Sequence, residues 1–160
     1  MEELEQYYKK IAETTDKMIP CDWDKVWMYA EILDDSAGIT FYFTEPNSEE
    51  RVYGDDIPER YKVSDSVYDH LLVELCEAFE ELKNEYIKND LGAWTTATLQ
   101  LEKSGKFSIE YGYEDILNTG LYGIQRIEVW EYETFGILPE NEKNKEIVLN
   151  YIKNKENNNN

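Results

Sequence analysis

A chain of 160 residues is long enough for one globular domain with a single hydrophobic core. The chain has 35 aspartate and glutamate residues against 16 lysine and arginine residues, which gives a formal net charge of −19. This charge argues against a function in which a basic surface binds nucleic acid or anionic membranes. Aromatic residues make up 14% of the chain, so we expect a packed core and not general disorder.

The first third of the chain predicts a helix followed by a β-hairpin. Apolar residues recur at helical spacing from Leu4 to Met18, and Pro20 ends the pattern. Residues 25–33 and 39–44 alternate as strands do, with a turn at residues 34–38 between them. The polar segment 45–64 is expected to hold one further short strand near residues 51–53.

The strongest periodicity predicts a helix over Asp65–Lys88. Its apolar residues fall within an arc of about 100°, while most of its acidic residues lie outside that arc. Ser64 is the predicted N-cap, and Asp65 in the first turn suits the helix dipole. One face of this helix should therefore pack against the core, and the other should carry dense negative charge.

The remaining elements complete an α+β pattern. Residues 97–101 and 107–113 predict a second hairpin around Ser104-Gly105, and residues 140–155 predict a last helix. Residues 121–135 fit a helix better than a strand, although Ile127 and Val129 leave a strand open. We therefore expect one domain over residues 1–156, an antiparallel sheet of two hairpins with helices packed against it, and a disordered Asn-rich tail at 157–160.

The sequence contains no recognisable catalytic pattern. His70 is the one histidine, which excludes histidine-dependent triads and zinc sites with several histidines. Cys21 and Cys76 have no metal-ligand spacing and are expected to act as small buried hydrophobes, and the four tryptophans are expected in the core. Phosphate-binding loops are missing as well. We therefore expect neither an enzyme nor a cofactor, although a metal site built only from carboxylates stays open.

Negative charge is concentrated in the folded body and not in a tail. Residues 34–59 contain eight acids and one arginine, and residues 65–90 contain eight acids and two lysines, whereas residues 140–160 are neutral overall. Such a surface attracts cationic partners. The candidate binding residues are acids in predicted turns and on the long helix: Asp34, Asp35, Asp55, Asp56, Glu74, Glu77, Glu81, Glu114 and Asp115.

Three groups of residues, in order along the chain, together resemble the YezG family of antitoxins. The opening group is Met18-Ile19-Pro20, Trp23, Lys25-Val26 and Tyr29-Ala30-Glu31. The central group is Trp94-Thr95, Leu101, Gly105-Lys106-Phe107, Tyr111 and Tyr113-Glu114-Asp115. The closing group is Arg126, Trp130, Tyr132 and the run Phe135-Gly136-Ile137-Leu138-Pro139-Glu140.

This resemblance implies an immunity protein of a Gram-positive bacterium that binds the C-terminal nuclease domain of an LXG-type or related type VII-secreted toxin. It implies no catalytic residues, and no direct contact with nucleic acid or membrane. The chain has neither a signal-like basic start with an apolar run nor a membrane-length apolar segment, so we expect it in the cytoplasm. Two other functions stay open: a secretion chaperone or adaptor for the toxin, and a carboxylate-metal hydrolase.

Overall fold

The computed structural model describes residues 2–158 and divides them into two compact units. The first unit ends at Glu114 and the second begins at Asp115. The α+β fold expected from the sequence is confirmed. The prediction of one domain over residues 1–156 stays a prediction.

An antiparallel five-stranded sheet forms the framework of the first unit, in the order β3-β2-β1-β4-β5. The strands are β1 (Lys25–Ile32), β2 (Ala37–Thr44), β3 (Val52–Tyr53), β4 (Thr96–Glu102) and β5 (Phe107–Gly112). The predicted hairpins are β1–β2 and β4–β5, and they join edge to edge through β1 and β4.

Side chains alternate across this sheet, so that one face is apolar. Along β1 the buried inward residues Val26, Met28, Ala30 and Ile32 follow the period of two that a strand requires. The register places Phe43 of β2 and Leu101 of β4 on either side of Val26. The same pairing continues along all three strands, which makes this face one side of the hydrophobic core.

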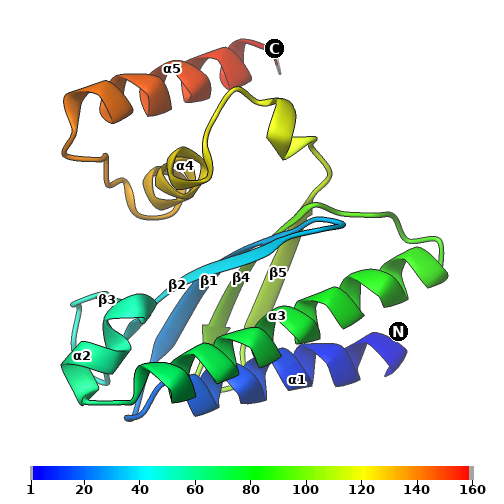
Figure 1. The fold of residues 1–160 in the computed structure, drawn as a ribbon, viewed down its shortest axis with the longest axis vertical. Coiled ribbons are helices and arrows are strands. Elements are labelled where there is room, and N and C mark those ends of the chain that lie inside the picture. Colours follow the sequence, from blue (N-terminus) through cyan, green and yellow to red (C-terminus); the bar gives the residue numbers. More distant parts are fainter. Residues whose placement is uncertain (1, 159–160) are drawn as a thin grey trace. The chain divides into compact units, whose positions relative to one another are not determined.

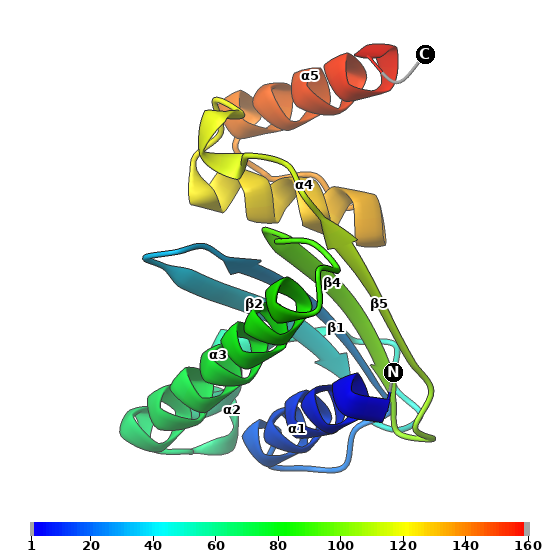
Figure 2. The same cartoon turned by 90° about the vertical axis from the view of Figure 1, so that its right-hand side faces the viewer.

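Two helices cover that face, α1 (Glu2–Met18) and α3 (Asp65–Lys88), and they lie side by side (Figures 1 and 2). Leu75, Phe79 and Leu82 of α3 are fully buried, and Ile11 is their counterpart on α1. Burying side chains of this size contributes about 1.5–3 kcal/mol each. Both helices were predicted. Ser64 is the N-cap of α3, but its hydroxyl pairs with that of Ser66 and does not cap the helix.

A short helical segment that the sequence pattern does not predict connects β3 to α3. It consists of a 3₁₀ turn, η1 (Gly54–Asp56), and the five-residue helix α2 (Ile57–Tyr61). Lys62 ends α2 in the left-handed conformation, with φ of 57°. Pro58 at the start and Lys62 at the end leave too few residues for an apolar period to develop.

The second unit consists of the 3₁₀ turn η2 (Ile116–Asn118) and two helices, α4 (Gly123–Phe135) and α5 (Glu142–Asn158). The segment 121–135 thus forms a helix over residues 123–135 and contains no strand. Gly136 ends α4 with φ of 73°, a conformation that glycine adopts without steric cost. α5 includes residues 157 and 158 of the expected tail, and residues 159–160 lie outside the described residues.

The tryptophans and the cysteines were both expected to be buried, and the structure agrees better for the tryptophans. Trp23, Trp94 and Trp130 are buried as expected, and Trp27 is half-buried. Cys21 and Cys76 are half-buried instead of buried. Within residues 2–158 no helix is both long enough and apolar enough to cross a membrane.

Candidate functional site

The turn between β1 and β2 carries Asp34 and Asp35 next to α3. Both aspartates are exposed, and Leu33 N donates to Ser36 O across the turn at 2.8 Å. The turn and the C-terminal half of α3 enclose a hollow of about 500 Å³. The structure therefore brings Asp34 and Asp35 together with Glu80 of α3, which also lines the hollow.

Glu80 is a functional candidate that was not among the residues predicted from the sequence, although it lies outside the apolar arc of the helix. Glu77 precedes it by three residues, so the two share one side of α3 and are both exposed. No hydrogen bond or ion pair joins the carboxylates of Asp34, Asp35, Glu77 or Glu80 to another residue within 2–158. We refer to these four residues as the turn–helix acidic surface.

The lysine that lines the same hollow is engaged inside the protein. Lys83 is only 9% exposed, its Nζ donates to Ile32 O at 2.7 Å, and it lies 6.0 Å from the centre of the Trp94 ring. The other lysine of α3 is Lys88 in the last turn. The outward face of α3 therefore offers a partner many carboxylates and little positive charge.

Two further predicted acids of α3 have partners within the chain. Glu81 pairs with Lys10 of α1 at 3.0 Å, and Glu74 lies 3.5 Å from Nε2 of the exposed His70. Both pairs are solvent-exposed to a large degree, and such pairs contribute little to stability. Glu81 is thus partly neutralised by Lys10, whereas Glu77 has no cationic partner within residues 2–158.

Asp55 and Asp56 belong to the 3₁₀ turn η1, which a close contact holds in place. A Cβ atom on Gly54 would lie 2.6 Å from the Phe41 ring, so only glycine allows this approach. Asp55 accepts hydrogen bonds from Tyr68 Oη at 2.9 Å and Tyr53 Oη at 3.1 Å. Burial raises the pKa of Tyr68, and the charge of Asp55 raises it further. Asp55 is therefore anchored to α3.

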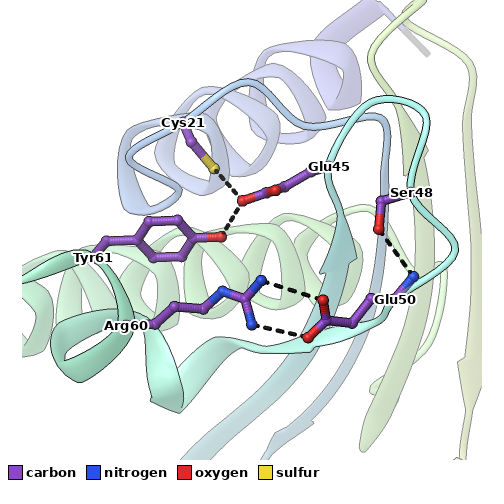
Figure 3. A network of polar contacts seen from close by, with 6 residues as sticks. All are labelled: Cys21, Glu45, Ser48, Glu50, Arg60 and Tyr61. Carbon is purple, nitrogen blue, oxygen red and sulfur yellow. Dashed lines mark hydrogen bonds and ion pairs between the residues drawn. The ribbon is translucent and has the colours of Figure 1, made fainter.

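The loop before β3 is tied to α2 by a polar network (Figure 3). Tyr61 Oη donates to Glu45 Oε1 at 2.5 Å, and Cys21 Sγ donates to the same oxygen at 3.7 Å. Arg60 donates to both oxygens of Glu50, at 2.9 and 3.4 Å, and this hydrogen bonding lowers the pKa of Glu50. Burial raises the pKa of Tyr61, with the hydrogen bond to Glu45 adding to it. Glu45 and Glu50 are therefore satisfied within the chain.

Glu114 and Asp115 stand at the boundary between the two compact units. Glu114 is the last residue of the first unit, and its carbonyl oxygen accepts from Thr95 Oγ1 at 2.7 Å. Asp115 begins the second unit and accepts a hydrogen bond from the Asn118 amide. The predicted residues therefore do not form one continuous site: Asp34, Asp35 and Glu77 contribute to the turn–helix acidic surface, whereas Asp55–Asp56 and Glu114–Asp115 lie elsewhere in the chain.

The part of the chain that the structure describes has no cluster of metal-ligating side chains. Among residues 2–158, no group of three or more histidine, cysteine, aspartate or glutamate side chains is arranged to hold a metal ion. Burial raises the pKa values of the Cys21 and Cys76 thiols, which opposes formation of the nucleophilic thiolate.

Comparison with known proteins assigns the chain that carries this acidic surface to a family. The family model described as "Immunity protein YezG-like" matches residues 4–149. The chain belongs to the family of YezG-like immunity proteins. It is 46% identical over 149 residues to "Immunity protein YezG" of Bacillus spizizenii, a match that covers 93% of this chain and 92% of the relative.

Two further relatives support the same assignment. "Immunity protein YezG" of Bacillus subtilis is 44% identical, with 93% of this chain and 99% of the relative covered. "Type VII secretion system protein EsaG" of Staphylococcus aureus is 36% identical, with 88% of this chain and 86% of the relative covered. The family resemblance expected from the sequence is confirmed.

Proposed function

We propose that this immunity protein neutralises a cognate secreted toxin by binding the toxin's basic nuclease domain and keeping nucleic acid away from it. An immunity protein implies a toxin partner. The observation that carries the proposal is the turn–helix acidic surface, whose four carboxylates are exposed and have no cationic partner within residues 2–158. The protein would act in the cytoplasm of the toxin-producing cell, without catalysis.

The electrostatics favour a cationic partner of this kind. A nuclease must be positively charged where it contacts phosphates. Part of its affinity for nucleic acid comes from the counterions that are released when its lysines and arginines neutralise those phosphates. A chain with a net charge of −19 attracts such a domain over a distance and accelerates encounter at low salt. Bound carboxylates would then occupy the positions of phosphate groups.

The predicted residues are not equivalent under this proposal. Asp34, Asp35 and Glu77 can pair with toxin lysines or arginines without first breaking an internal bond, and Asp56 is likewise exposed. The acids with internal partners, Asp55, Glu74 and Glu81, would have to exchange those partners or share them. Glu114 and Asp115 stay candidates at the boundary between the units.

A binding measurement with matched variants tests the proposal. We expect Asp34→Asn/Asp35→Asn to weaken affinity for the nuclease domain of the toxin encoded beside this protein by at least about tenfold, or about 1.4 kcal/mol. Glu3→Gln/Glu5→Gln removes the same charge from an exposed part of α1 and should bind like the unchanged protein. Equal affinity of the two double variants would overturn the assignment of this surface.

The activity of the bound toxin separates inhibition from other functions. The proposal requires that nuclease activity falls in proportion to the amount of complex and that affinity falls with increasing salt. A stable complex that still degrades DNA and RNA would instead identify a secretion adaptor. Failure to bind the toxin at all would overturn the proposal.

A further inference from the structure

The ladder between β1 and β4 ends with an unusual exchange of hydrogen bonds. In an antiparallel ladder every second pair of opposed residues is hydrogen-bonded, and the two residues of such a pair normally donate to each other's carbonyl groups. Ile32 N donates to Thr95 O at 2.9 Å, but Thr95 N donates to Gly112 O of β5 at 2.8 Å and not back to Ile32. The carbonyl group of Ile32, at the last residue of β1, is thereby left without its strand partner.

Lys83 takes the place of that missing donor. Its ammonium group reaches from α3 to Ile32 O at 2.7 Å, and hydrogen bonds from charged donors are the stronger kind. Burying an ammonium group is costly unless it is well solvated by the protein. The Ile32 carbonyl and the Trp94 ring at 6.0 Å provide part of that solvation, and Asp34, Asp35 and Glu80 line the same hollow.

The turn that follows Ile32 needs such support. Leu33 and Ser36 are joined by a backbone hydrogen bond, which leaves Asp34 and Asp35 as a two-residue loop. The two-residue turns that match the twist of a hairpin require positive φ at one or both loop residues. Neither Asp34 nor Asp35 has a positive φ, so the turn does not belong to these favoured types.

We propose that Lys83 is a positioning residue, which holds the end of β1 through the Ile32 carbonyl and so fixes the Asp34–Asp35 turn in the conformation that binds the toxin. This inference rests on the proposed function. Lys83 does not itself contact the partner, because it is buried in the lining of the hollow.

Amide hydrogen exchange tests the positioning role without any toxin. Lys83→Met keeps the length and packing of the side chain but removes the donor. We expect exchange at Leu33 N to accelerate about tenfold or more, the effect of losing one hydrogen bond from a charged group. Lys88→Met removes the same charge from an exposed position on the same helix and should leave that exchange unchanged. Unchanged exchange in Lys83→Met would overturn the inference.

Toxin affinity then tests whether Lys83 acts through the turn. In a double-mutant cycle, Lys83→Met and Asp34→Asn/Asp35→Asn should each weaken binding, and their combination should weaken it by less than the product of the two fold-changes. Independent effects would overturn the inference, as would a Lys83→Met chain that is unfolded without urea, because Lys83 would then serve general stability. If the aspartate substitutions alone leave affinity unchanged, the proposed surface fails, and the exchange experiment still decides the role of Lys83.

Discussion

Single carboxylates in this protein differ in what they contact, and Asp16 illustrates the difference. Asp16 Oδ1 accepts hydrogen bonds from Trp23 Nε1 at 2.9 Å and Lys103 Nζ at 3.1 Å, and Lys103 Nζ lies 4.8 Å from the centre of the Trp23 ring. The hydrogen bond from Trp23, followed by that from Lys103, lowers the pKa of Asp16 although partial burial opposes the shift. The cluster links the end of α1 to the turn between β4 and β5.

A lowered pKa predicts a definite pH dependence. The folded-state pKa of Asp16 lies below its unfolded value, so its stabilising contribution is present above about pH 4 and is lost as the pH falls through the folded pKa. Because the Asp16 side chain is 55% exposed, we expect only about 0.5–1 kcal/mol. Urea unfolding of Asp16→Asn should show this loss at pH 7, and the difference from the unchanged protein should shrink as the pH falls below about 4.

Asp22→Asn serves as the control, because Asp22 is exposed on the same segment. A difference between Asp16→Asn and the unchanged protein that stays constant from pH 7 to pH 3 would contradict the explanation.

Exposure of an acidic residue can be predicted from the sequence more readily than whether its carboxylate has a partner within the chain. Asp34, Asp35 and Glu77 were expected on the surface and lie there, since turn positions and the outer face of a helix can be read from periodicity. The role of Lys83 could not be read in this way. It depends on a carbonyl group 51 positions away in the chain, which tertiary structure alone brings within 2.7 Å.

Among the elements, the long periodic ones and the short strand β3 were predicted, whereas the short helical segments η1, α2 and η2 were not. α3 begins and ends where its periodicity predicts, because 24 residues give several turns of a consistent apolar face. α2 has five residues and cannot show a period. The pairing of β1 with β4 was also not predictable, because every strand presents one apolar face and any two could in principle be neighbours.

The turn η1 depends on one glycine, which gives a prediction at the scale of this element. A Cβ atom at residue 54 would lie 2.6 to 2.8 Å from three atoms of the Phe41 ring, and Phe41 is itself only 2% exposed and cannot move freely. We expect Gly54→Ala to reduce the free energy of unfolding by about 1–3 kcal/mol, the usual cost of overpacking. Urea denaturation measures this change.

Gly38→Ala is the matched control, because a Cβ atom at Gly38 would meet nothing within 4 Å. Equal stability of the two alanine variants would show that the Phe41 contact does not restrict residue 54.

The whole molecule is divided near residue 115, and this division predicts where proteases cut. Tyr113, Leu117 and Tyr122 are 56%, 66% and 77% exposed, and they lie on the segment between the sheet and α4. Exposed connecting segments are the preferred sites of proteolysis. Limited digestion with chymotrypsin should therefore cut first between residues 113 and 122, as mass spectrometry of the fragments would show. First cuts within α3 or the sheet would contradict the division.

The difference between the two faces of α3 affects how such a protein can evolve when the sequence of its toxin changes. Leu75, Phe79 and Leu82 belong to the core, whereas Glu77 and Glu80 are exposed and form no hydrogen bond or ion pair with the other described residues. Substitutions at exposed positions of this kind usually change stability by less than about 0.5 kcal/mol. Under the proposed function, mutation could therefore revise the pattern of charges that selects a partner while the scaffold stays intact. New pairings of toxin and immunity protein could then arise through viable single steps.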